Sequence, residues 1–486
     1  MTRMPQTDSA TGTATTRSPI RVPRPWLVVL VACAGQFLVV LDVSVMNVAL
    51  PSMKADLGLG TLGLQWVLNA YSIAFAGFML LGGRAADLYG RKTMFLAGLG
   101  LFTAASVVGG LAPEGAHLIA ARAAQGLGAA ALSPATLTLV TAAVPAGAAR
   151  TRAIGTWTAV GAAGGAAGGF VGGALVDLLN WRWVLLVNVP LGVLILAAAA
   201  LGLREGRADA GRRPDLPGAV LVTAGLATLA YGIVRTELSG WTSAATLLPL
   251  LGGLALLAVF VAVERRTKEP LVPLGIFRNR AVSAANAGMM LGGASSFAMW
   301  FFMTVYAQNV LGYTPLQAGL ALVPSSLAVL VGSKTAPRLM AVTGARNLAV
   351  AGLLVAAAGF VWQSTMTADG TFLTTILGPG LLMMGGIGLA TTPLATLATS
   401  GAAPGDAGLV SGLVNTSRTM GGALGLAVLT TVAASVPAGA LGTPDGDRLV
   451  PGYAMAFRVS AALLVTAAAL MAVWLPRPVH RTVQKP

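Results

Sequence analysis

The sequence predicts an all-α integral membrane protein whose chain crosses the bilayer fourteen times. Three features of its 486 residues support this fold class: 56% are hydrophobic, only 10% are charged, and the mean hydropathy is +0.78. A soluble protein needs far more charge to cover its surface. Apolar runs of about 20 residues recur from end to end, which is the length that a helix needs to cross ~30 Å of hydrocarbon.

The apolar runs form groups of six, two and six. The first group predicts helices at 26–50, 62–81, 93–111, 118–140, 153–175 and 184–203. After a polar stretch come two helices, at 218–234 and 244–263. After a second connector comes the last group, at 281–311, 315–336, 347–363, 372–398, 408–433 and 453–475. We therefore divide the chain into an N-terminal six-helix bundle (26–203), two inserted helices with basic connectors (204–280) and a C-terminal six-helix bundle (281–475).

The two ends of the chain are predicted to be cytoplasmic tails. Residues 1–25 are rich in Thr, Ser and Pro and contain no apolar core, so we expect a disordered tail and not a cleavable signal peptide. Residues 476–486 form the second tail. An even number of crossings places both tails on the same side of the membrane.

The basic residues indicate which side that is. With both tails in the cytoplasm, the tails and inside loops hold 24 of the 31 Lys and Arg, and the outside loops hold four. Membrane insertion produces this bias. The net charge of +15 is spread over short loops and not along one helix face, so no nucleic-acid partner is predicted. Arg outnumbers Lys 26 to 5, which is typical of G+C-rich bacterial coding and suggests a bacterial cytoplasmic membrane.

The sequence contains no recognisable metal or nucleotide site. Cys33 is the only cysteine, and His117 and His480 have no cluster of ligands beside them. The pair Gly126 and Gly128 lies in an apolar helix with no strand before it, and 83–93 lacks the Gly-Lys-Ser/Thr ending of a phosphate loop. We therefore expect no metal and no cofactor, and a driving force other than ATP.

Asp42 is the only acid within the fourteen predicted segments. A charge at that depth costs several kcal/mol, so the carboxylate must be paired, hydrated or protonated. Its structural alternative is a simple ion pair, but intramembrane acids usually mark ion or substrate paths. Arg122 is a candidate counter-charge, or else a helix-end arginine that reaches the headgroups. Gln125 adds a polar group to the same face as Arg122.

The fifth predicted segment is built for close packing. Gly161, Gly165, Gly169 and Gly173 repeat at every fourth position, and a second column runs parallel at 164, 168 and 172. Two stripes without side chains allow neighbouring helices to approach backbone to backbone.

Several motifs, in order along the chain, resemble one family. Residues 83–92, Gly-Arg-Ala-Ala-Asp-Leu-Tyr-Gly-Arg-Lys, resemble the loop signature of the major facilitator superfamily between helices 2 and 3. Four further motifs are similar to signatures of its fourteen-helix drug:H⁺ antiporter branch: Leu41–Pro51, Arg122–Gly126, Trp181–Gly192 and Gly412–Arg418. The resemblance covers Trp26 to Leu475.

The resemblance implies a major facilitator fold, with two six-helix bundles around a midplane cavity and two extra central helices. It implies proton coupling by Asp42 and Arg122, and packing by the antiporter motif Gly161, Gly165, Gly169 and Gly173. It also implies a conformational latch formed by Gly83, Asp87, Gly90 and Arg91. In this branch, prolines usually occupy the positions of Gly165 and Gly169, and Ala85 and Leu88 also depart from the loop signature.

The expected function is proton-coupled export of a drug, antibiotic or similar amphipathic small molecule, with the lipid bilayer, protons and cargo as partners. We expect a transporter and not an enzyme, active as a monomer. An importer of a metabolite and a dedicated exporter of one self-made natural product stay open as alternatives. Candidate cavity residues are the polar, aromatic and Met side chains of the segments: Gln36, Asn47, Asn69, Gln125, Trp157, Asn286, Trp300, Tyr306, Met383, Asn415 and Arg418.

Tags placed at residue 10 and after Lys485 test the predicted topology. Both tags are expected to resist external protease in intact cells, because the distribution of Lys and Arg places both tails inside. A tag in the predicted outside loop at residue 242 is the control and should be cut. Cleavage of either terminal tag from outside would contradict fourteen crossings with cytoplasmic ends.

Overall fold

The computed structural model describes residues 25–145, 148–205, 215–268, 270–399, 407–436 and 445–475. Within these ranges the chain is helical throughout and contains no strand. The predicted tails, apart from Pro25, and most of the first polar connector lie outside the described residues.

All fourteen predicted segments are helical. The first six are α1 (Pro25–Leu57), α2 (Thr61–Tyr89), α3 (Arg91–Gly110), α4 (Gly115–Ala143), α5 (Ala148–Leu178) and the pair α6 (Trp183–Leu186) and α7 (Asn188–Gly202). The inserted helices are α8 (Leu216–Ser239) and α9 (Ala244–Glu264), followed by a 3₁₀ turn at Leu274–Arg278. The last six are α10 (Arg280–Asn309), α11 (Pro315–Thr343), α12 (Ala345–Gln363), α13 (Gly378–Thr399), α14 (Ala407–Ser435) and α15 (Asp445–Trp474).

Two predicted segments are not single helices. The segment 184–203 is interrupted at Val187, so that Asn188 begins α7. The segment 372–398 opens with a π-helical stretch, Phe372–Leu377, before α13. In the described part of the chain, thirteen helices are long and apolar enough to cross a membrane, and α14 is not among them.

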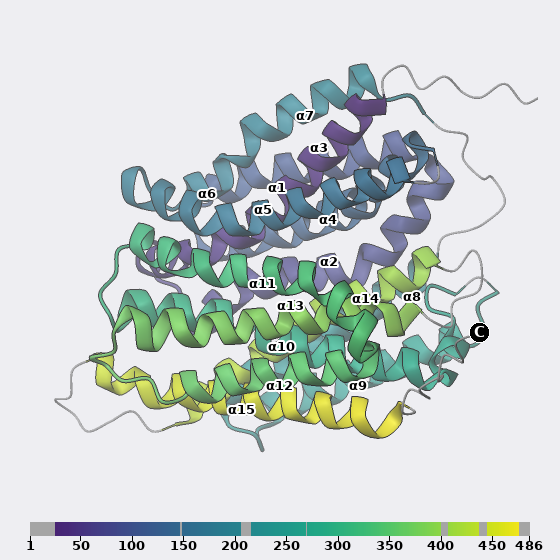
Figure 1. Cartoon of the computed structure of the whole chain (residues 1–486). Helices are drawn as coiled ribbons and strands as arrows, with labels where there is room; N and C mark the ends of the chain where they lie inside the picture. The colour runs from purple at the N-terminus through teal and green to yellow at the C-terminus, as the bar shows by residue number, and fades with distance from the viewer. Residues whose placement is uncertain are drawn as a thin grey trace, which may run out of the picture.

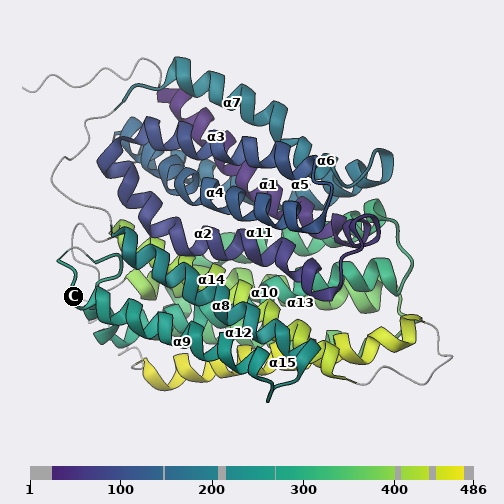
Figure 2. The ribbon, with the colours of Figure 1, turned by 180° about the vertical axis from the view of Figure 1, so that it is seen from behind.

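The helices form two bundles (Figure 1). In the first, α1 packs on α5, and α4 packs on α2 and α3; in the second, α10 packs on α14, and α13 packs on α11 and α12. The bundles meet where α5 contacts α11 and where α2 contacts α14. The inserted helix α8 packs against α9, α2 and α14, so it lies beside one of these two seams. The start of α1 and the end of α15 lie at the same end of the molecule in both views (Figures 1 and 2).

The two glycine columns of α5 face different neighbours. The column at 164, 168 and 172 packs on α1: a Cβ atom at Gly172 would lie 2.9 Å from the Cα atom of Val45, and one at Gly168 would overlap Ser44. The Ser44 hydroxyl also donates a 2.7 Å hydrogen bond to the carbonyl oxygen of Gly165. Backbone contact of this kind requires residues without side chains, so the predicted close packing is confirmed for this column.

The glycines of the second column have two different sets of neighbours, one in α1 and one in the other bundle. Gly161 and Gly165 face Gln36 and Val40 of α1 without close overlap. Gly169 and Gly173 meet α11, where a Cβ atom at Gly319 would overlap the carbonyl oxygen of Gly169. The backbone N–H of Leu316 donates a 3.1 Å hydrogen bond to Asp177 in the same region. The bundles therefore touch backbone to backbone near the end opposite Pro25.

Gly319→Leu should hold this end open, because the added side chain has no space beside the Gly169 backbone. Overpacking costs roughly 1–3 kcal/mol, so the ratio of closed to open molecules should fall by at least about fivefold. The measurement is the rate at which a membrane-impermeant maleimide, added outside, labels Ser44→Cys in a Cys33→Ala background. Gly155→Ala is the matched control in α5, since nothing lies within 4 Å of its added Cβ atom. Equal labelling rates in both variants would contradict the expectation that the Gly169–Gly319 contact closes this end of the molecule.

Candidate functional site

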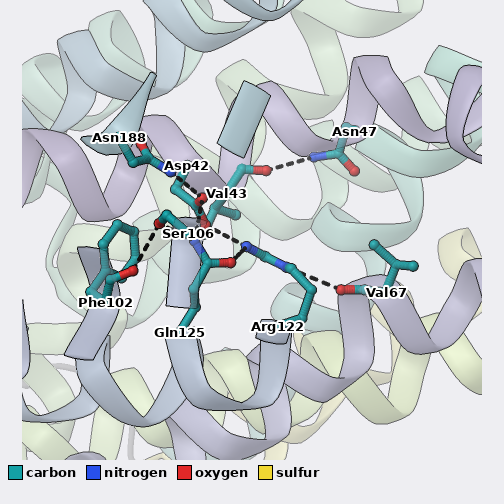
Figure 3. Close-up of polar contacts among 9 residues, drawn as sticks. All are labelled: Asp42, Val43, Asn47, Val67, Phe102, Ser106, Arg122, Gln125 and Asn188. Atoms are coloured by element: carbon teal, nitrogen blue, oxygen red, sulfur yellow. Dashed lines mark hydrogen bonds and ion pairs between the residues drawn. The ribbon is translucent and has the colours of Figure 1, made fainter. Parts of the chain in front are cut away.

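The core of the first bundle contains a buried ion pair. Arg122 of α4 places a guanidinium nitrogen 2.6 Å from Oδ2 of Asp42, near the middle of α1 (Figure 3). The side chains of Asp42 and Arg122 are 0% and 1% exposed. The structure therefore supports the interpretation of Arg122 as the counter-charge, and it excludes an arginine that reaches the headgroups.

Neighbouring amides complete the surroundings of Asp42. Its Oδ1 accepts a 2.8 Å hydrogen bond from Asn188 and a 3.2 Å bond from Gln125. Gln125 lies one turn from Arg122 on the same face of α4, accepts a 2.7 Å bond from it, and donates a 2.7 Å bond to Ser106. The carboxylate thus accepts from three side chains (Figure 3).

Arg122 is held on its other side by α2. Its Nε donates a 3.2 Å hydrogen bond to the carbonyl oxygen of Val67, and its guanidinium carbon lies 4.4 Å from the centre of the Tyr71 ring. A cation over an aromatic face is stabilised by the ring quadrupole. The guanidinium therefore has partners on α2 besides the carboxylate of Asp42.

A central cavity of about 480 Å³ lies beside this pair, between the two bundles. Helices α1, α2, α4 and α5 supply one wall, and α10, α11 and α14 supply the other. Six of the predicted cavity residues line it: Gln36, Asn47, Trp157, Trp300, Asn415 and Arg418. Tyr71 also lines it, so a single side chain contacts both the cavity and Arg122.

The other five predicted cavity residues do not line this cavity. Gln125 faces Asp42, and Asn69 is buried within α2 with no hydrogen-bond partner among the described residues. Asn286 accepts from Ser417. Tyr306 and Met383 are fully buried in the core, where the Tyr306 hydroxyl donates to the carbonyl oxygen of Thr367. All five are buried, which residue type alone does not reveal.

The loop signature lies at the junction of α2 and α3. Gly90 has φ +96°, a conformation that favours glycine. The next residues bind the end of α7: Lys92 Nζ donates 2.8 Å bonds to the carbonyl oxygens of Ala200 and Leu203. Glu205 accepts from the backbone N–H groups of Lys92 and Thr93 at 3.2 and 3.0 Å. A carboxylate at a helix N-terminus is stabilised by the helix dipole.

The proposed latch residues have different environments. The Asp87 side chain lies outside the described residues, although its backbone belongs to α2. A Cβ atom at Gly83 would lie 3.7 Å from the Cβ atom of Pro134, which is an ordinary contact distance. A Cβ atom at Gly90 would overlap the carboxylate of Glu205. Arg91 is half-buried at the start of α3.

Sequence reasoning missed four contributors to these sites. Asn188, Ser106 and Tyr71 surround the ion pair, and Glu205 joins α7 to α3. Asn188 could have been predicted, because it lies in the motif Trp181–Gly192. Ser106, Tyr71 and Glu205 had none, since each reaches the site from another helix or connector.

Comparison with known proteins identifies relatives over most of the chain. The family model "Major Facilitator Superfamily" matches residues 32–426. The cephamycin export protein CmcT of Amycolatopsis lactamdurans is 48% identical over 92% of each chain. The puromycin resistance protein pur8 of Streptomyces alboniger is 39% identical over 92% of this chain and 91% of its own. The multidrug resistance protein Stp of Mycobacterium tuberculosis is 37% identical over 88% and 79%.

Solved structures share the fold at low sequence identity. A peptide transporter POT in complex with sulfate superposes with a TM-score of 0.67 and 16% identity, over 92% of this chain and 93% of its own. A bacterial homologue of the lysosomal transporter Spinster, in an inward-facing conformation, gives 0.67 and 16%, over 93% and 96%.

Asp42→Asn, Arg122→Gln and the double variant should reveal coupling within the ion pair. Removing one member of a buried pair costs up to about 3–5 kcal/mol, because it leaves the other charge unpaired. We therefore expect the thermal unfolding midpoint of the double variant to fall by less than the sum of the decreases in the two single variants.

The surface pair Asp56–Arg182 is the control for this cycle. Its side chains are 47% and 33% exposed at the same 2.6 Å separation, so solvent screens it and each substitution should change the midpoint little. Purely additive losses at Asp42 and Arg122 would contradict an energetically coupled buried pair.

Proposed function

The chain belongs to the Major Facilitator Superfamily, and from that premise we propose that it exports an antibiotic or a similar amphipathic small molecule in exchange for protons. It is a multi-pass membrane transporter of small molecules and not an enzyme. Its relatives named above are an exporter and two resistance proteins, which favours export over import. The observation that carries the coupling mechanism is the Asp42–Arg122 pair beside the central cavity.

Proton coupling follows from the chemistry of this pair. A proton that arrives from outside neutralises Asp42, and Arg122 then loses its anionic partner. Arg122 rests on Tyr71, and Tyr71 lines the cavity. A shift of the guanidinium therefore changes the cavity wall. When the proton leaves toward the cytoplasm, the pair forms again.

One proton supplies enough free energy for useful export. A charge that crosses ~100 mV releases about 2.3 kcal/mol, and a tenfold concentration ratio costs about 1.4 kcal/mol. One proton for each cargo molecule therefore sustains a gradient of nearly two decades.

The setting that we propose is a bacterial cytoplasmic membrane, with both termini in the cytoplasm and a single chain as the functional unit. No bound cofactor enters the mechanism. A dedicated exporter of one natural product is the second candidate, favoured by the 48% identity to a cephamycin export protein. The two candidates are separated by measuring how susceptible a host that expresses the chain is to cephamycin, puromycin and unrelated drugs. Resistance to a single compound favours the dedicated exporter.

Asp42→Asn should abolish uphill transport while leaving cargo binding in place. Asn keeps the size and an accepting oxygen but cannot ionise. The measurement is the accumulation, in inside-acidic proteoliposomes, of an antibiotic to which the chain makes its host resistant. Binding of the same antibiotic and thermal melting of the protein are measured in parallel. Arg122→Ala should impair coupling as well, and the double variant should be little worse than either. Asp56→Asn is the control carboxylate outside the buried pair. Wild-type accumulation by a well-folded Asp42→Asn protein would remove Asp42 from the mechanism.

A further inference from the structure

The central cavity carries one uncompensated positive charge, on Arg418 of α14. Its side chain is exposed to the cavity. Its only polar contact among the described residues is a 3.0 Å hydrogen bond that it donates to the neutral Asn415. Asp42 pairs with Arg122 and Asp56 pairs with Arg182, and no described carboxylate lies within ion-pair distance of Arg418. Arg418 thus has no carboxylate partner there.

Nothing else on the described cavity wall offsets this charge. The lining consists of apolar, aromatic, hydroxyl and amide side chains, and it includes no acid and no second base. Asp42 and Arg122 neutralise each other and lie behind the wall. The net charge that a cargo molecule meets is therefore one positive charge, in a site lined by helices of both bundles.

An unpaired cation between membrane helices is costly, and an arginine there usually marks a pathway or a partner. Arginine stays charged at all relevant pH, so it cannot relieve this cost by losing its proton. Its planar fork matches a carboxylate in two parallel hydrogen bonds. An anionic group on the cargo would supply the missing partner.

Arg418 also lies where two hollows meet. A second pocket of about 200 Å³ within the C-terminal bundle is lined by residues of α10 to α14, and it shares Trp300, Val329 and Arg418 with the central cavity. The central cavity adds Trp157 and Phe297 as further aromatic surface. The site thus offers apolar space on both sides of one fixed cation.

We propose that the cargo is an amphipathic organic anion, whose carboxylate binds Arg418 while its aromatic or apolar body occupies the two adjoining hollows. The proposal rests on the proposed export function, since it names the cargo class of that site. The positive charge of Arg418 would repel cationic drugs, which should therefore bind poorly.

Binding of matched probes tests the cargo class. The panel consists of naphthalene and pyrene fluorophores, each prepared as the butyric acid, the butyramide and the butylamine. The purified wild-type protein should bind the acids at least about tenfold more tightly than the amides, as expected for a hydrogen bond to a charged group, and the amines most weakly.

Substitution assigns the preference to Arg418. Arg418→Gln should reduce acid affinity about tenfold or more and leave amide affinity nearly unchanged, while Arg418→Lys keeps most of the preference. A purely structural role would weaken acid and amide alike. Arg458→Gln is the matched control, because Arg458 lies in α15 and lines neither hollow. Absence of an acid preference, or its survival in Arg418→Gln, overturns the proposal.

Transport in proteoliposomes adds a second readout. One proton entering against one anion leaving moves two positive charges inward, whereas a neutral cargo moves one and a cation moves none. A potassium diffusion potential of about 59 mV changes the equilibrium ratio tenfold per charge moved. The acids should therefore respond about a hundredfold and the amides tenfold.

Probe binding and proteoliposome transport together distinguish failure of the proposed cargo class from failure of the proposed export function. Proton-driven export of amides or amines, with no acid preference, overturns the anionic cargo and leaves the proposed function standing. Acid-selective binding that depends on Arg418, without proton-driven transport of any probe, contradicts the proposed function and supports the cargo class.

Discussion

The cost of charge in hydrocarbon is the constraint that organises this molecule. Among the described residues, Asp42, Arg122 and Arg418 carry the charges at the buried pair and at the central cavity. Asp42 and Arg122 pair at 2.6 Å, and amide groups bind the remaining lone pairs of the carboxylate, which offsets part of the cost of burying both charges. Arg418 keeps its charge and faces the cavity. We propose that the paired charges bind the proton and that the unpaired charge binds the cargo.

Communication between these charges depends on close packing around α1 and α2. The glycine column of α5 lets α1 approach backbone to backbone, so Asp42 has little freedom to move away from its partners. Tyr71 lies on the opposite side of Arg122 and forms part of the cavity wall. In the proposed mechanism, proton and cargo therefore act on adjoining side chains, because Tyr71 contacts both Arg122 and the cavity.

The sequence was informative where a single residue is decisive. Asp42 is a lone acid in apolar surroundings, Arg122 is the available counter-charge, and glycine spacing predicted the close contact of the column at 164, 168 and 172 with α1. It was uninformative where the answer depends on the direction of a side chain. Tyr306 and Met383 have suitable chemistry for a cavity and are fully buried. Glu205 acts because a connector brings it to the start of α3, and no local pattern encodes that geometry.

The contact between Gly169 and Gly319 has a consequence for how this protein can diverge in sequence. When two side chains pack together, enlargement of one is tolerated if its neighbour becomes smaller, and such positions change as pairs. Here the obstacle is a main-chain oxygen, which no substitution can shorten. A larger residue at Gly319 therefore has no compensating partner on α5. Revertants of such a variant should carry second changes elsewhere, at positions that alter the balance between open and closed forms.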